Sequence, residues 1–326
     1  MDALEIARYA DAVRENVSKV IVGKHAVIDL VMVSILCEGH ILLEDVPGIG
    51  KTMLARSVAR SLKCQFHRIQ CTPDLLPSDI TGTYIFNQKT GDFEFRKGPV
   101  FAQIVLADEI NRATPRTQSA LLEAMEERQV TLEGETWLLP RPFLVMATQN
   151  PVELEGTFPL PEAQLDRFLM KIRLGYTTEE EDNIILDRFL SRNPVEDLKP
   201  VLSSEEVLQL QNECRKVKIS PDVRKYIIGI IRATREQTSV QLGASPRAMI
   251  GLSRTAQALA AIRGRDFVIP DDVKYLAPFV LAHRIIPTAT LSLKGQSGDD
   301  VIREVLAKVP TPVEAESENV VSKQTS

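Results

Sequence analysis

Short apolar segments that each end on polar residues recur in the first half of the chain. They cover residues 39–44, 101–109 and 143–151. Unbroken apolar runs of this length are typical of strands that are covered on both faces of a parallel sheet. After the first of them, Leu54, Val58 and Leu62 recur at the spacing of a helix. The pattern predicts an α/β fold with a parallel sheet flanked by helices, and ligands bind such sheets where the strands end.

Charged amphipathic helices with short breaks replace this pattern from Tyr176 onward. Four helix starts are predicted from capping residues, namely Thr178, Ser203 with Glu206, Ser220 with Pro221, and Pro270. We therefore expect an α/β domain over residues 1–175 and an all-helical domain over residues 176–309. The tail, residues 310–326, is rich in Glu, Ser, Thr and Val without periodicity, which predicts disorder. A length of 326 residues also fits two domains.

Two segments of alternating polar and apolar residues interrupt the α/β pattern. Residues 84–96 predict a hairpin with its turn at 89–92, and residues 130–138 predict a second with its turn at 133–135. Such hairpins either cap the core or face a partner molecule, and both interpretations stay open.

The segment between the first strand and the following helix carries residues suited to phosphate. It reads EDVPGIGKT over residues 44–52, and its glycines let several backbone N–H groups turn inward. Lys51 supplies a positive charge for the β- and γ-phosphates, and Thr52 supplies a hydroxyl for Mg²⁺. In the general pattern G-x-x-x-x-G-K-[ST] the first glycine falls where this chain has Asp45. Because a helix starting at Lys51 would also attract anions, ATP or GTP is the expected ligand.

Polar residues at the ends of the two later strands predict the chemistry. Asp108 and Glu109 follow an apolar run. Asp108 is expected beside Mg²⁺, and Glu109 is expected to accept a proton from, or to orient, the attacking water. Asn150 ends the third segment and is expected to hold this water or the γ-phosphate, although Asn-Pro is also a common turn. Together with the phosphate loop, these residues predict a Mg²⁺-dependent nucleotide hydrolase.

Four motifs taken together resemble the MoxR ATPases of the AAA+ superfamily. They are residues 48–52 (GIGKT), 107–113 (ADEINRA), 147–151 (ATQNP) and 160–168 (LPEAQLDRF). The resemblance runs from about Val20 to Arg247, and Asp45 is not unusual in that family. It implies an AAA+ P-loop NTPase domain followed by a helical lid, ATP and Mg²⁺ as cofactors, and assembly with copies of itself into rings that are usually hexamers.

The resemblance also assigns roles outside the phosphate loop. Arg167 matches the arginine finger, which reaches into the neighbouring subunit's site, although its position also suits an ordinary surface arginine near the end of a short helix. Val22 and Gly23 fall in a segment that resembles the one lining the adenine pocket, although an apolar turn that merely packs is the alternative. The preference for ATP over GTP is implied by the family resemblance and not by these residues. The expected nucleotide contacts are Val22, Gly23, Pro47, Gly48, Ile49, Gly50, Lys51, Thr52, Met53, Asp108 and Arg247, the expected catalytic residues are Lys51, Glu109, Asn150 and Arg167, and the expected Mg²⁺ ligands are Thr52 and Asp108.

Arg247 draws attention for a local reason as well. Ser245 and Pro246 predict a helix start, which places Arg247 in the first turn. A cation there opposes the helix dipole, and a nearby anion would offset this cost. By resemblance, Arg247 matches the sensor-2 arginine through which AAA+ lids touch ATP, while a simple ion pair is the alternative.

Composition and charge narrow the class of protein. Acidic and basic residues are interspersed and the net charge is −5, which disfavours a broad nucleic-acid surface. No stretch is long and apolar enough to cross a membrane and the first residues lack a secretory signal, so a cytoplasmic location is expected. Four irregularly spaced cysteines argue against a disulfide framework.

The combined expectation is an ATPase that hydrolyses ATP between the subunits of a ring. The resemblance implies that it remodels, activates or assists metal insertion into client proteins, with von Willebrand factor A domain proteins as candidate partners. Two alternatives stay open: a motor subunit of a metal-chelatase-type complex, and a nucleotide-dependent binding switch that hydrolyses slowly. The intact Glu109 and Arg167 argue against the switch. A DNA-remodelling ring and a small-molecule kinase are disfavoured, the first by the acidic charge balance and the second by the interface arginine.

Overall fold

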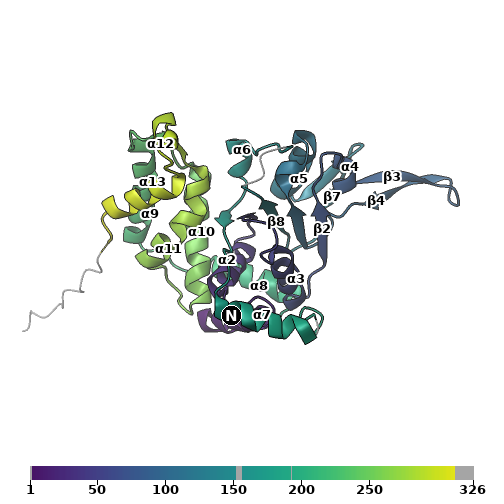
Figure 1. Ribbon diagram of the computed structural model, residues 1–326, viewed down its shortest axis with the longest axis horizontal. Helices are drawn as coiled ribbons and strands as arrows, with labels where there is room; N and C mark the ends of the chain where they lie inside the picture. Colours follow the sequence, from purple (N-terminus) through teal and green to yellow (C-terminus); the bar gives the residue numbers. More distant parts are fainter. Residues whose placement is uncertain (1, 152–155, 192, 313–326) are drawn as a thin grey trace, which may run out of the picture.

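The computed structural model describes residues 2–151, 156–191 and 193–312, and its centre is a five-stranded parallel sheet (Figure 1). The strand order is β2 (Phe66–Gln70), β5 (Ile104–Asp108), β8 (Leu144–Gln149), β1 (Ile41–Glu44) and β9 (Met170–Ile172). The three strands β1, β5 and β8 fall in the apolar segments of the sequence. Ala147 of β8 pairs with Ala107 on one side and with Leu42 on the other, so these three strands end at the same edge of the sheet. The predicted parallel α/β fold is confirmed.

Both faces of the sheet are buried, which explains the unbroken apolar runs. Along β1, Ile41 and Leu43 belong to one core and Leu42 belongs to the other, because successive side chains of a strand point to opposite faces. The first core also contains residues of α1 (Ala3–Ser18), α2 (His25–Leu36) and α3 (Lys51–Ser61). The second contains residues of α4 (Pro77–Thr81), the 3₁₀ helix η1 (Ile110–Arg112) and α5 (Pro115–Glu127).

Both predicted hairpins are confirmed. They are β3 (Gly82–Asn87) with β4 (Asp92–Lys97), and β6 (Gln129–Leu132) with β7 (Glu135–Leu138). The two hairpins pack on each other near their bases, where the rings of Phe95 and Trp137 lie 4.9 Å apart between centroids. The β3–β4 hairpin projects away from the rest of the molecule (Figure 1), and it carries the exposed rings of Phe86 and Phe93 next to its turn. The bases therefore support the core, whereas the end of β3–β4 is available to a partner.

Helices dominate the chain after the sheet. They are α7 (Glu179–Ser191), α8 (Ser204–Cys214), α9 (Pro221–Glu236), α10 (Pro246–Ile262), α11 (Pro270–Leu281), η2 (Ala282–Arg284), α12 (Ala289–Leu293) and α13 (Gly298–Lys308). The four predicted helix starts are confirmed, and Ser203 accepts a hydrogen bond from Glu206 N at 3.3 Å. The prediction of an all-helical region is wrong in one detail: β10 (Val240–Leu242) pairs with β11 (Ile286–Pro287). These strands are too short to show an alternating pattern in the sequence.

The helical region packs directly on the α/β part. Apolar residues of α8, α10 and α11 belong to the same core as α1, α2 and one face of the sheet. The segment before α8 is also tied to α3, since Arg60 donates to Val195 O at 2.6 Å and Val201 N donates to Ser61 O at 2.8 Å. The division at residue 175 stays a prediction. Residues 313–326 of the predicted disordered tail lie outside the described residues. Across the described ranges, no helix has both the length and the apolar character that a bilayer requires.

Two buried histidines predict a loss of stability in mild acid. His40 accepts from Val145 N at 3.0 Å and contacts Met125 O at 2.9 Å, and burial lowers its pKa to about 4. Burial likewise lowers the pKa of His283 to about 3. Below pH 6.5 the unfolded chain binds protons that the folded chain does not, so folding becomes less favourable as the pH falls. Between pH 7.5 and 5.5 the free energy of unfolding should fall by about 3 kcal/mol, roughly half from each histidine.

Urea unfolding at the two pH values measures this effect. In a His40→Gln variant the fall should be about half as large, because only His283 still contributes. His67 is exposed, so His67→Gln is the matched control and should retain the full fall. An undiminished fall in His40→Gln would contradict the assignment.

Candidate active site

The phosphate loop lies between the end of β1 and the start of α3. Gly48 and Gly50 have φ angles of +84° and +92°, which other residues rarely adopt. A Cβ atom added at either position would meet nothing within 4 Å, so glycine is required by the backbone conformation rather than by lack of space. α3 begins at Lys51, and the free N–H groups of its first turn and the positive end of its dipole favour an anion. Backbone and helix together suit a nucleotide phosphate.

Asp45 has a structural task that explains its place in the loop. Its carboxylate accepts a hydrogen bond from Leu174 N at 2.5 Å, and its own N–H donates to Gln149 O at 3.2 Å. The start of the phosphate loop is thereby tied both to β8 and to the chain that leaves β9. The departure from the general glycine pattern therefore secures the loop and removes no phosphate-binding group.

Lys51 is nine-tenths buried at the base of the loop, and its Nζ donates to Asp45 O at 2.7 Å. Burial lowers its pKa, while the carboxylates of Asp45, Asp108 and Glu109 oppose this shift. These carboxylates favour the charged ammonium group that phosphate binding requires. The next residue, Thr52, lies in the first turn of α3 and is half-buried.

Asp108 ends β5 at the same edge of the sheet. One of its carboxylate oxygens accepts from the hydroxyl of Thr148 at 2.6 Å, and the other accepts from Nε of Arg68 at 3.1 Å. Thr148 is fully buried at the end of β8, the neighbouring strand. These contacts hold the Asp108 carboxylate in place at the end of β5, and its role as a Mg²⁺ ligand stays a prediction.

Glu109 adopts a left-handed backbone conformation with φ of +58°, which is unusual for a residue other than glycine. Its N–H donates to Thr148 Oγ1 at 2.7 Å. Its carboxylate contacts Gln70 Nε2 at 3.3 Å and Arg112 Nη1 at 3.1 Å. Left-handed residues of this kind cluster at functional sites, and here the conformation turns Glu109 out of the strand direction while three neighbours hold it.

The residues at this edge fit ATP and Mg²⁺. A hydroxyl from Thr52 and a carboxylate from Asp108 are hard oxygen ligands of the kind that Mg²⁺ uses together with phosphate oxygens. Asn150 is buried directly after β8, so its place at this edge agrees with the prediction. Pro47 and Ile49 belong to the loop itself, while Met53 follows Thr52 in α3 and packs partly against the core.

The predicted adenine segment lies beside the chain that follows β9. Val22 is buried, and Gly23 has a φ angle of +72°. A Cβ atom on Gly23 would lie 1.6 Å from Oε1 of Glu181. Lys24 donates to Tyr176 O at 2.7 Å. These contacts bring the segment close to the chain that Asp45 also binds, and the adenine role of Val22 and Gly23 stays a prediction.

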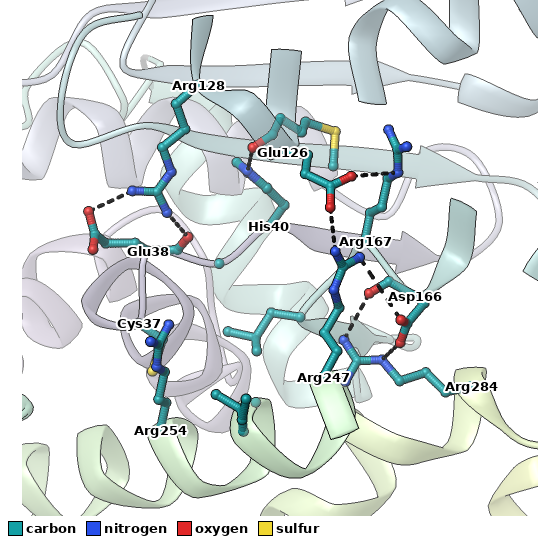
Figure 2. A pocket seen from close by; sticks show the side chains of 15 residues that line it. Cys37, Glu38, His40, Glu126, Arg128, Asp166, Arg167, Arg247, Arg254 and Arg284 are labelled. Atoms are coloured by element: carbon teal, nitrogen blue, oxygen red, sulfur yellow. Dashed lines mark hydrogen bonds and ion pairs between the residues drawn. The ribbon is translucent and has the colours of Figure 1, made fainter. Parts of the chain in front are cut away.

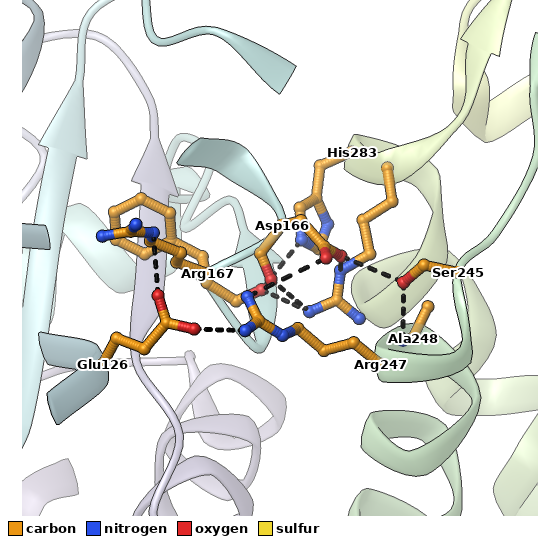
Figure 3. Close-up of polar contacts among 9 residues, drawn as sticks. Glu126, Asp166, Arg167, Ser245, Arg247, Ala248 and His283 are labelled. Atoms are coloured by element: carbon orange, nitrogen blue, oxygen red, sulfur yellow. Dashed lines mark hydrogen bonds and ion pairs between the residues drawn. The ribbon is translucent and has the colours of Figure 1, made fainter. Parts of the chain in front are cut away.

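Arg167 lies at the edge of the sheet where the parallel strands begin, whereas the phosphate loop lies at the edge where they end. It follows α6 (Glu162–Leu165) and precedes β9, and Leu169 N donates to His40 O at the point where β1 begins. The phosphate loop starts at Asp45, after β1 ends. At about 3.3 Å per residue, His40 just before β1 and Asp45 at the start of the loop are about 15 Å apart. Nε of Arg167 instead contacts Glu126 Oε2 at 3.1 Å, near the end of α5 (Figure 3).

Arg247 lies beside Arg167, and this changes the interpretation of the lid arginine. α10 begins at Pro246 with Ser245 as its cap, so the predicted first-turn position is confirmed. The guanidinium group of Arg247 forms an ion pair with Glu126 and lies 4.0 Å from Asp166. In this conformation Arg247 is at the edge away from the phosphate loop of its own chain. Contact with the nucleotide of its own chain therefore lacks support from the geometry. The observed contact with Glu126 is the ion pair that the sequence left as the alternative, and the predicted contact with ATP stays a prediction.

A cavity of about 420 Å³ lies between α10 and the α/β part, and both arginines line it (Figure 2). Arg284 lies at its side, almost fully buried, and contacts Asp166 Oδ1 at 3.1 Å and Phe168 O at 2.7 Å. Burial lowers the pKa of Arg284 to about 10, which leaves it charged at neutral pH. Arg284 thus anchors Asp166, and through the chain it anchors the adjacent Arg167.

Sequence reasoning did not assign roles to several residues of the site. They are Arg68, Gln70, Arg112, Glu126, Thr148, Asp166 and Arg284. Gln70 and Thr148 are polar residues at the ends of strands, and this signal could have suggested both. Glu126 and Arg284 carry no comparable signal, since they meet the site only through the packing of helices.

Comparison with known protein families covers both parts of the chain. Residues 40–170 match the model of the ATPase family associated with various cellular activities (AAA), and residues 232–305 match an AAA lid domain. A solved structure from Cytophaga hutchinsonii, of a protein provisionally called an ATPase, superposes with a TM-score of 0.89. It shares 44% sequence identity and covers 95% of this chain and 97% of its own.

Curated relatives identify the family to which this chain belongs. The chain is 51% identical over 300 residues to the uncharacterized protein YeaC of Bacillus subtilis, which covers 92% of this chain and 94% of that protein. It is 44% identical over 306 residues to chaperone MoxR1 of Mycobacterium tuberculosis, covering 91% of this chain and 81% of that protein. The chain therefore belongs to the MoxR family of AAA+ ATPases.

Proposed function

We propose that this protein hydrolyses ATP with Mg²⁺ at sites that are shared between neighbouring copies of the chain in a ring. One observation carries the proposal. Lys51 and Glu109 lie at one edge of the sheet, while Arg167 and Arg247 lie together at the other. A single chain therefore offers no arginine of this pair to its own phosphates, and a neighbouring copy placed edge to edge would supply both.

Within one chain, the phosphate loop and Lys51 bind the β- and γ-phosphates. Thr52 and Asp108 would hold Mg²⁺, which neutralises charge on the β- and γ-oxygens when it is bound. Glu109 takes a proton from the attacking water or orients it, and contacts with Gln70 and Arg112 hold its carboxylate in place. Asn150, which directly follows β8, would help to hold the same water or the γ-phosphate.

The neighbouring chain contributes Arg167 and Arg247. A guanidinium group placed against the transferred phosphoryl group stabilises the charge that develops on it, which in other enzymes raises the rate by about 10³–10⁵. We assign this catalytic role to Arg167. We assign Arg247 to the same nucleotide, because the two side chains converge on one carboxylate and so can converge on one phosphate.

We propose that the protein uses the energy of ATP hydrolysis for chaperone-like work. A relative that is 44% identical bears the name chaperone, and the exposed Phe86 and Phe93 on the projecting β3–β4 hairpin suit contact with an apolar client segment. Client activation, metal insertion, partnership with von Willebrand factor A domain proteins, a hexameric ring and a cytoplasmic location all stay predictions. Magnesium-chelatase subunits resemble a shorter part of this chain, so the chelatase alternative has weaker support.

Turnover per chain measured over a wide range of protein concentration tests the shared site. With ATP and Mg²⁺, we expect turnover per chain to rise steeply with concentration, because each active site needs two chains. If turnover per chain stayed constant down to protein concentrations at which the chains no longer assemble, the shared site would be contradicted. Tight ATP binding with negligible turnover at every concentration would instead favour the slow binding switch.

A further inference from the structure

Glu126 contacts both of the arginines that we assign to the neighbour's nucleotide. Its Oε2 lies 3.1 Å from Nε of Arg167, and its Oε1 forms an ion pair with Nη2 of Arg247 (Figure 3). The three residues come from three separate elements: α5, the turn after α6, and the start of α10. Within the described ranges, Glu126 is the carboxylate that both arginines share.

The ion pair between Glu126 and Arg247 places each charge at a helix end where the helix dipole disfavours it. Glu126 lies in the last turn of α5, where the helix dipole disfavours a negative charge, and Arg247 lies in the first turn of α10, where it disfavours a positive one. Each residue therefore opposes the dipole of its own helix and is stabilised by the other. A purely structural ion pair could be formed at lower cost by placing the charges elsewhere on the two helices.

Arg167 and Arg247 keep a net positive charge beside Glu126, so an anion with more negative charge can bind them. Asp166 is already engaged by the buried Arg284, so Arg167 and Arg247 share Glu126 and retain about one positive charge between them. Their side chains are 31% and 48% exposed and line the cavity, and Glu126 is 33% exposed. A phosphate group brings more negative charge and one more acceptor oxygen than a carboxylate. It can therefore replace Glu126.

We propose that Glu126 is a resting counter-ion that holds Arg167 and Arg247 and that the terminal phosphate of the neighbour's ATP displaces. The inference rests on the shared site proposed above. Glu126 belongs to the α/β part and Arg247 to the lid helix α10, so displacement breaks an ion pair that joins the two parts. The neighbour's nucleotide thereby loosens the lid of the chain that contacts it.

Assembly in the presence of Mg²⁺ and a non-hydrolysable ATP analogue tests this role without relying on turnover. Sedimentation velocity gives the protein concentration at which half of the chains are assembled. Glu126→Gln keeps the shape of the side chain and removes its charge, so the nucleotide no longer has to displace an anion. We expect half-assembly at a concentration about three- to tenfold below that of the native chain.

Two controls isolate the ion pairs. Glu127→Gln removes the same charge from the same helical turn, and Glu127 takes part in no ion pair in the part of the chain that the structure describes, so this variant should assemble like the native chain. The gain from Glu126→Gln should also vanish when Arg167 and Arg247 are both replaced by Ala. Thermal unfolding of each variant confirms that it is folded.

Unchanged or weaker assembly of Glu126→Gln would overturn the inference, and so would a gain that persists without the two arginines. If the native chain itself does not assemble with the analogue, the shared site fails and the inference fails with it. The first two results leave nucleotide-dependent assembly of the native chain intact, so they are distinguishable from the third.

Discussion

Replacing Arg167 by Ala should lower ATP turnover by about 10³-fold or more while nucleotide binding by the same chain stays nearly unchanged. The reason is the position of Arg167 between α6 and β9, about 15 Å along the sheet from the loop that we expect to bind phosphate. In our proposal the side chain therefore acts on another chain's nucleotide and does not contact that of its own chain. Steady-state turnover and the affinity for a fluorescent ATP analogue, measured at one protein concentration, separate the two effects.

Mixing two inactive variants gives a sharper form of this prediction. Glu109→Gln lacks the carboxylate that handles water but retains Arg167, whereas Arg167→Ala lacks the arginine but retains Glu109. In a ring assembled randomly from equal amounts of both, about a quarter of the interfaces combine an intact Glu109 site with an intact Arg167. Turnover should therefore recover to roughly a quarter of the native value.

Arg224→Ala is the matched control for the arginine variant. Arg224 is exposed on α9 and, across the ranges that the structure covers, has no ion pair, so its replacement should leave turnover unchanged. If the mixture of Glu109→Gln and Arg167→Ala stays inactive while both variants assemble, Arg167 does not act across an interface. A strong loss of ATP binding in Arg167→Ala would place its effect within the same chain.

The sheet and the phosphate edge were accessible from the sequence because their signals are local. A buried parallel strand needs an unbroken apolar run, and its ligand-binding end is marked by the first polar residues that follow. Asp108 and Asn150 end or directly follow such runs, and Lys51 is the first residue of the helix that follows β1. Each signal is contained in fewer than ten consecutive residues, so no knowledge of packing was needed.

The part of the proposed site formed by Arg167 and Arg247 depends on contacts between segments that are distant in the sequence. Because Arg247 opposes the dipole of its helix, the sequence predicts a nearby anion, and the structure shows Glu126 there, 121 residues away in sequence. Nothing local marks Glu126, because a glutamate near the end of a charged helix is common. The edge at which Arg247 lies is likewise decided by how α10 packs on α1 and α2, which sequence periodicity does not specify.

Replacing Glu109 by Gln should lower turnover by about 10²–10⁴-fold and leave ATP binding intact. Glutamine keeps the size of the side chain, and its amide can still pair with Gln70, but it cannot accept a proton from water. The phosphate loop, Thr52 and Asp108 are unchanged, so the nucleotide should remain bound without being hydrolysed. Single-turnover hydrolysis and equilibrium ATP binding, measured on the same preparation, test the two halves of the prediction.

The same variant should also stabilise the assembled form. Because bound ATP is not consumed in Glu109→Gln, its γ-phosphate stays available to the neighbour's Arg167 and Arg247, and assembly should persist for as long as ATP is present. Glu123→Gln, the same charge change on the exposed surface of α5, should hydrolyse ATP and assemble like the native chain. Native-like turnover in Glu109→Gln would mean that another group activates the water. Loss of ATP binding would mean instead that Glu109 maintains the phosphate site, and the left-handed turn that carries it would then be the feature to vary next.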